Sequence, residues 1–100
     1  MKSLQELFSD PSRWTQGISA RDARGYATYI SNPAARSWCL WGGCVRIYGG
    51  TGPIFNEIFK KLEQAVKQYT GEDDSSPTSF NDRPTTSIED IQAVVKLAGV

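Results

Sequence analysis

The 100-residue chain contains no histidine, only two cysteines and no long apolar run. Without histidine there is no Ser–His or Cys–His nucleophile pair, no imidazole base near neutral pH and no histidine metal site. Catalysis would have to rest on carboxylates, lysine or tyrosine, and the sequence shows no cluster of these residues that indicates it. An enzyme is therefore the least favoured function class, and we expect no catalytic residue, no cofactor and no metal.

The chain also lacks an excess of charge of either sign. Eleven basic residues balance eleven acidic ones, so no net field attracts the protein to nucleic acid or to an anionic membrane. No apolar segment approaches the ~20 residues that span a bilayer, and the amphipathic N-terminus with its two acids differs from a signal peptide. We expect a cytoplasmic protein whose partners include neither nucleic acid nor membrane.

Length and hydrophobic periodicity predict one globular domain over residues 1–100 with a mostly α fold. We expect a compact bundle of about four helices. Between the first and second long helical segments, residues 18–31 combine turn residues at 21–25 with an aromatic and β-branched run at 26–30, which favours a small β-hairpin or an extended loop. The four helices are expected near residues 3–9, 33–48, 53–70 and 87–98.

Capping residues indicate where these helices begin and end. Asn32 is expected to cap the second helix, with Pro33 at its first position. Ser87 is expected to cap the last helix, which Gly99 ends. Residues 71–78 are polar and acidic and predict an exposed loop, whose acids lack the ligand spacing of a calcium loop.

Residues 37–44 form the most unusual segment, because they combine two of the three tryptophans, both cysteines and a glycine pair. On a helix over 33–48, Trp38 and Trp41 would lie on one stripe. Glycine in a helix interior costs about 1 kcal/mol relative to alanine. Gly42 and Gly43 therefore predict the close approach of another backbone.

The two cysteines are expected to be buried, reduced packing residues. On one helix, Cys39 and Cys44 would be separated by roughly 140° of rotation and about 7.5 Å of rise. This geometry does not suit an undistorted disulfide, and reduced thiols favour a reducing compartment. Cys39 is disfavoured as a nucleophile, since no histidine can serve as its base.

Residues 81–83 form the most site-like polar cluster, and they allow two interpretations. In the favoured one, Asn81 and Asp82 bond neighbouring backbone groups in a turn. Asp82 would then pair with Arg36 or Arg46 and fasten the turn to the core. In the other, residues 81–83 line the rim of a pocket floored by Trp38 or Trp41, suited to a small polar or anionic ligand.

The order of several motifs resembles that of a known family. The sequence WTQG at residues 14–17 is followed by WCLWGG at 38–43, and FNDRPTT at 80–86 leads into the last helix. This order is similar to the DUF6197 family of small bacterial and phage proteins of unknown function. Gly43 stands where that family usually has alanine, and Phe80 where it usually has tryptophan. The resemblance implies a compact, mostly helical domain and no assigned activity.

Among the function classes, we expect a non-enzymatic interaction or regulatory module, such as a phage or prophage accessory protein, that acts by binding a protein partner. The alternative is a protein that binds or sequesters a small polar or anionic ligand. The sequence leaves the oligomeric state open. Both classes use the same candidate binding residues, which are Trp38, Trp41, Gly42, Gly43, Asn81, Asp82 and Arg83.

Overall fold

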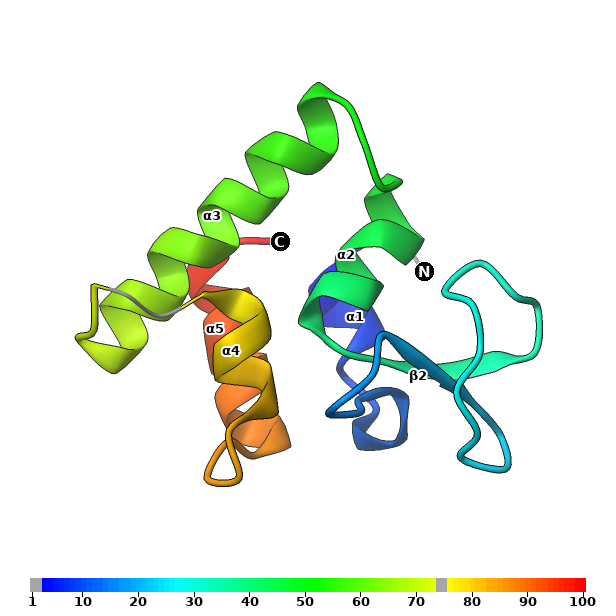
Figure 1. Ribbon diagram of the computed structural model, residues 1–100. Helices are drawn as coiled ribbons and strands as arrows, with labels where there is room; N and C mark the ends of the chain where they lie inside the picture. The colour runs from blue at the N-terminus through cyan, green and yellow to red at the C-terminus, as the bar shows by residue number, and fades with distance from the viewer. Residues whose placement is uncertain (1–2, 74–75) are drawn as a thin grey trace.

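The computed structural model describes residues 3–73 and 76–100 and has a mostly helical fold with one small sheet (Figure 1). The mostly α class is thereby confirmed. The bundle of four is not, because the described residues form five α-helices, of which α1 and α4 are very short. The helices are α1 (Leu4–Leu7), α2 (Leu40–Tyr48), α3 (Pro53–Thr70), α4 (Pro77–Asp82) and α5 (Ile88–Ala98), with a 3-10 helix η1 (Pro11–Arg13) and strands β1 (Ala20–Asp22) and β2 (Ala35–Trp38) between α1 and α2.

The two long C-terminal helices agree with the sequence. α3 begins at Pro53 and ends before Gly71, which adopts a left-handed conformation with φ 74°. Ser87 and Asp90 form a capping box at the start of α5, in which the Ser87 N–H donates to Asp90 Oδ2 at 2.8 Å. Their buried residues join one hydrophobic core, namely Phe55, Leu62, Ala65 and Val66 of α3 and Ile91, Val94 and Val95 of α5.

The predicted helix over 33–48 is wrong over residues 33–39, because α2 begins only at Leu40. The Asn32 side chain accepts a hydrogen bond from the Ala34 N–H at 2.8 Å and so closes a turn instead of capping a helix. Residues 35–38 are extended, and they pair antiparallel with residues 20–22. Strand propensity depends strongly on such long-range partners, so the second strand lies inside what local signals marked as helix.

Cys39 takes the capping position that the sequence assigned to Asn32. Its backbone is extended, with φ −78° and ψ 176°, and its Sγ accepts from the Gly42 N–H at 3.2 Å. Helix α2 therefore begins at Leu40, and Trp38 and Trp41 do not share a helical stripe. Trp38 ends the strand and is buried, whereas Trp41 lies in the first turn of α2 and remains 37% exposed.

The loop expected over 71–78 is shorter than predicted. Residues 71–73 are exposed, residues 74 and 75 lie outside the described residues, and α4 begins at Pro77. Ser76 caps α4 by accepting from the Ser79 N–H at 3.1 Å. Among the residues that the structure describes, no helix has both the length and the apolar composition needed to cross a membrane.

Asn81 joins three parts of the chain at the centre of the fold. Its side chain is fully buried. Oδ1 accepts from Trp14 Nε1 at 2.7 Å and from the Leu40 N–H at 3.0 Å. Nδ2 donates to the Thr15 carbonyl at 3.1 Å and to Asp82 Oδ1 at 3.0 Å. These four bonds use the full capacity of the amide, and they connect the segment after η1, the start of α2 and the end of α4.

Gly42 and Gly43 meet different neighbours. A Cβ on Gly42 would collide with the backbone carbonyl oxygen of Ser19, which is held in place by accepting from the Cys39 N–H at 3.2 Å. A Cβ on Gly43 would lie 2.9 Å from side-chain atoms of Leu7 and Phe8. The predicted backbone approach is confirmed at Gly42, while Gly43 packs against side chains.

Replacing Asn81 with alanine should lower the free energy of unfolding by about 2–4 kcal/mol, because the buried Leu40 N–H and the part-buried Trp14 indole N–H lose their acceptor. Urea denaturation followed by tryptophan fluorescence measures this loss. Asn56, exposed on α3, supplies the matched control, and its replacement with alanine should change stability by less than about 0.5 kcal/mol. Equal effects of the two substitutions would contradict a central role for the Asn81 amide.

Among glycine-to-alanine substitutions, Gly42→Ala should be the most harmful, costing about 2–4 kcal/mol, since its collision partner is a hydrogen-bonded backbone carbonyl. Gly43→Ala should cost less, because side chains can adjust. Gly50→Ala is the control, as its Cβ would lie 3.5 Å from Val45 Cγ1, an ordinary contact. Thermal unfolding monitored by circular dichroism gives the ranking, and a Gly42 variant as stable as the Gly50 variant would refute it.

Candidate functional site

A shallow, open pocket lies between α2, α4 and the loop that precedes β1. Its volume is about 270 Å³, slightly below the roughly 300–1,000 Å³ of pockets for drug-sized ligands. Such a space suits one long side chain or a small molecule. The pocket is lined by Gly17, Ile18, Ser19, Cys39, Trp41, Thr78 and Asp82.

Two hydrogen bonds hold the loop of residues 17–19 in place as one wall of the pocket. The Gly17 N–H donates to Asp82 Oδ1 at 2.9 Å and so binds the loop to the end of α4. The Ser19 carbonyl accepts from the Cys39 N–H at 3.2 Å and binds it to the start of α2. The loop is therefore fixed at both ends, and its middle residue, Ile18, stays 37% exposed.

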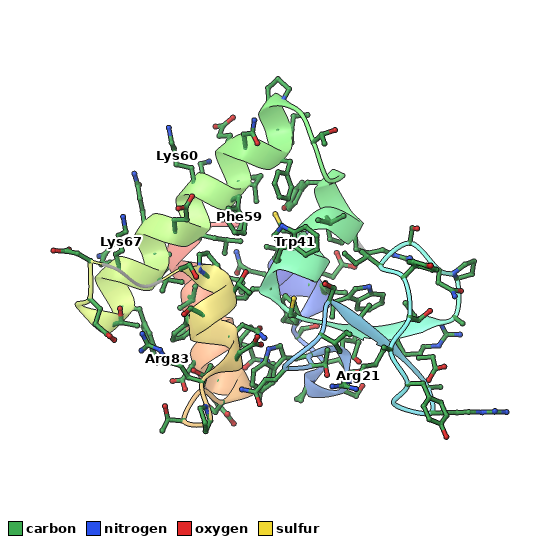
Figure 2. All side chains as sticks on the ribbon, viewed as in Figure 1. Arg21, Trp41, Phe59, Lys60, Lys67 and Arg83 are labelled. Atoms are coloured by element: carbon green, nitrogen blue, oxygen red, sulfur yellow. The ribbon has the colours of Figure 1, made fainter. Side chains whose placement is uncertain are left out.

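Trp41 supplies the aromatic part of the pocket. Figure 2 shows its side chain on the side of α2 that faces α3 and α4. Trp41 and Ile18 have the same exposed fraction, 37% each, and both line the pocket. Together they form an apolar surface beside the Asp82 carboxylate.

Asp82 is exposed and gives the pocket its charge. Its Oδ1 accepts from the Gly17 N–H and from Asn81 Nδ2. Within residues 3–73 and 76–100, no lysine or arginine forms an ion pair with this carboxylate. Asp82 therefore has a feature of each interpretation drawn from the sequence, because its carboxylate holds the Gly17 backbone in place and also lines a pocket.

The pairing of Asp82 with Arg36 or Arg46 that the sequence suggested is wrong. Arg36 Nη1 instead donates to the Pro33 carbonyl at 2.8 Å. Arg46 Nη1 donates to the Ile30 carbonyl at 3.0 Å, and its guanidinium lies 5.4 Å from the centre of the Trp38 ring. Both arginines form their hydrogen bonds on the β2 side of the molecule. Neither therefore neutralises the Asp82 carboxylate, which is exposed to solvent.

The remaining sequence candidates lie outside the pocket. Trp38 is buried beneath Arg46, and Asn81 is buried at the centre of the fold. Arg83 lies on the opposite side of α4 from Trp41 (Figure 2) and contacts the Glu72 carboxylate at 2.8 and 3.2 Å. Gly42 and Gly43 are packed against residues 7, 8 and 19. Of the candidate residues, only Trp41 and Asp82 line the pocket.

Sequence reasoning missed the other lining residues. Ile18 and Ser19 come from a segment without helical or strand periodicity, and Thr78 comes from the segment predicted as loop. No local signal marked Ile18, because a single apolar residue in the polar sequence TQGIS is ordinary on a protein surface. Nothing local indicated that this segment meets Asp82.

The pKa values of both thiols in the segment 39–44 are raised. Burial raises the pKa of the Cys39 thiol, and the Asp82 carboxylate raises it further, against the lowering effect of hydrogen bonds from the backbone N–H groups of Gly42 and Trp41. Burial also raises the pKa of Cys44 to about 12. Both cysteines are free and buried, as expected from the sequence. Cys39 therefore acts as a helix cap in its protonated form.

At pH 8, both thiols of the folded protein should react with iodoacetamide at least about tenfold more slowly than those of the urea-unfolded chain, because few thiolates are present. The raised pKa of Cys44 contributes stability that is present below pH 9, its ordinary value, and is lost as the pH rises toward about 12. The Cys44→Ala variant should lose less thermal stability between pH 8 and 10.5 than the wild type. Fast alkylation of the native protein would overturn this assignment.

The motifs at residues 14–17, 38–43 and 80–86 meet in space, since Asn81 bonds Trp14 and Leu40 and Asp82 bonds Gly17. No curated protein and no solved structure matches the chain at a significant level. A family of unknown function, DUF6197, matches residues 4–99, from the first residue of α1 to the glycine after α5. The chain therefore belongs to the DUF6197 family.

Proposed function

We propose that this protein is a non-enzymatic interaction module that binds a basic segment of a partner protein through the Trp41–Asp82 pocket. One observation carries the proposal. A half-exposed apolar surface, made by Ile18 and Trp41, lies in the same pocket as a carboxylate that no cation of the described chain pairs with. Lysine and arginine side chains combine an apolar stem with a charged end, and this combination matches the two parts of the pocket.

The expected free-energy contributions to binding favour a side chain with an apolar stem and a cationic end. A cation over an indole ring at an exposed site gains about 0.5–1 kcal/mol. A hydrogen bond to a charged group contributes about 1.5–3 kcal/mol. Burying the methylene stem against Ile18 and Trp41 adds about 0.8 kcal/mol per CH₂ group. These terms are modest, so a specific partner must also contact the surface around the pocket.

A second candidate function is the binding of a small polar ligand, which the pocket volume of about 270 Å³ supports. The negative charge of Asp82 determines which ligand charge the pocket favours. An anion would face an unneutralised carboxylate, whereas a small amine would gain the same interactions as a lysine end. Between the polar and the anionic ligands that the sequence left open, the pocket favours a polar ligand with positive charge.

We place this binding function in the cytoplasm, as part of a regulator or a phage-encoded accessory protein. The support comes from Cys39 and Cys44, both of which are buried free thiols. Free thiols persist in reducing compartments.

The proposal predicts that Asp82→Asn weakens binding to lysine- and arginine-containing peptides by about tenfold or more. Asparagine keeps an oxygen for the Gly17 N–H but removes the charge. An array of 12-residue peptides with one central basic residue, probed with the labelled protein, selects the binders, and fluorescence anisotropy then measures their affinities. Trp41→Ala should weaken the same peptides, while Glu89→Gln, which removes an exposed acid of α5, should leave them unchanged.

Two results of this experiment would overturn the proposal. One is selection of acidic peptides in place of basic ones, and the other is equal affinity of the wild type and the Asp82→Asn variant. Native mass spectrometry of the protein purified from cells that express it separates the two candidate functions. A bound protein supports the interaction module, a retained amine supports the small-ligand alternative, and a retained anion that Asp82→Asn does not release argues against both.

A further inference from the structure

The connection between β1 and β2 forms a surface of its own. In Figure 1 it extends from the molecule on the side opposite α3, α4 and α5. We call residues 21–36 the Arg–Tyr lobe, because exposed arginines and tyrosines dominate its surface. Tyr26 is 67% exposed and Tyr29 is 84% exposed, so most of each ring is accessible to a ligand.

Two hollows lie on this lobe. The first has a volume of about 270 Å³ and is lined by Asp22, Ala23, Arg24, Tyr26, Ala34 and Arg36. The second, of about 340 Å³, is lined by Ala27, Thr28 and Tyr29. The lobe therefore carries two open recesses, each with an exposed tyrosine, and the first also has two arginines.

Hydrogen bonds give the lobe a defined shape. Asp22 Oδ1 accepts from the backbone N–H groups of Arg24 at 2.9 Å and Tyr26 at 3.0 Å. Arg21 Nη1 donates to the Gly25 carbonyl at 3.0 Å. The only acid in the first hollow is thus engaged in folding the turn that presents Arg24 and Tyr26.

Neighbouring segments already bond to both edges of the sheet. The Thr15 N–H donates to the Trp38 carbonyl at 3.0 Å on the β2 side. The Thr28 N–H donates to the Ala20 carbonyl at 3.1 Å on the β1 side. The exposed side chains of the lobe are therefore its main contact surface for a ligand.

The charges of the chain are segregated, although they cancel overall. Residues 21–36 contain three arginines and a single acid, Asp22, whereas residues 57–100 contain eight acids and five basic residues. Within the described part of the chain, Arg24 forms no ion pair, and Arg36 bonds only to backbone carbonyls at residues 33 and 35. The lobe consequently has a local positive field that the net charge conceals.

We propose that the Arg–Tyr lobe binds single-stranded nucleic acid. Arg24 and Arg36 would contact backbone phosphates, for which the guanidinium group is well suited. Tyr26 and Tyr29 would stack on bases, as exposed aromatic rings do in proteins that bind single strands. An acidic peptide would satisfy the arginines but leave the tyrosine faces unused, and the bases of a duplex are stacked on each other and unavailable to the rings.

The balanced net charge of the chain alone predicts no nucleic-acid binding, and the Arg–Tyr lobe is separate from the Trp41–Asp82 pocket. The two surfaces share no lining residue. Failure of one proposal leaves the other standing.

Fluorescence anisotropy with a labelled 12-nucleotide single strand of mixed sequence, at 50 mM salt, tests the proposal. The double variant Arg24→Gln/Arg36→Gln should weaken binding about tenfold or more and reduce the slope of log K against log salt by about 1.4, the value for two lost phosphate contacts. Tyr26→Ala and Tyr29→Ala should each weaken binding about fivefold or more while leaving that slope unchanged. The matched control is Lys60→Gln/Lys67→Gln on α3 (Figure 2), which removes the same charge elsewhere and should change affinity less than about twofold.

Four outcomes would overturn the proposal. They are absence of binding at 50 mM salt, equal loss in the lysine control, equally tight binding of poly-glutamate, and equally tight binding of a duplex of the same sequence. Because Arg36 also bonds to the lobe backbone, the single variant Arg24→Gln is measured beside the double variant. A binding loss in Arg24→Gln with unchanged thermal stability supports the phosphate contact, and unchanged binding in it contradicts that contact.

Discussion

The fold depends on one buried amide. Asn81 makes four hydrogen bonds from a position with no exposed surface, and each bond ends on a segment distant in sequence or on the last residue of α4. An unpaired polar group in such a place would cost about 1–3 kcal/mol, so the amide must satisfy all its partners together. This requirement brings the segment after η1, the start of α2 and the end of α4 to a single point.

The pocket follows from that constraint. Asp82 comes directly after Asn81, and its carboxylate therefore reaches the Gly17 N–H. The loop of residues 17–19 then continues to Ser19, whose carbonyl binds the start of α2 and occupies the space that a side chain on Gly42 would need. The glycine that weakens α2 as a helix is what lets this loop approach. The proposed binding surface is thus a product of the same contacts that stabilise the domain.

The two proposed surfaces have opposite character. The Trp41–Asp82 pocket lies between α2 and α4 and carries an acid without an ion-pair partner among the described residues. The Arg–Tyr lobe lies on the side away from α3, α4 and α5 and carries arginines that form no ion pair with the described residues. A domain of this size has little interior to spare for a deep cavity. Both proposed surfaces are accordingly shallow and separate, as such a small core permits.

The sequence by itself determined the elements whose signals are local. Helices α3 and α5 could be predicted because their apolar stripes, their N-terminal residues Pro53 and Ser87 and their terminal glycines lie within each segment. The close approach at Gly42 could also be predicted, since a glycine pair inside a helix needs a neighbour. Tertiary structure alone decided that residues 35–38 form a strand, that Cys39 caps α2 and that Trp38 and Trp41 separate into core and surface. Those outcomes depend on pairing with residues 20–22 and on the Asn81 amide. Contacts between segments distant in sequence produce no periodic pattern within either segment, so local sequence does not predict them.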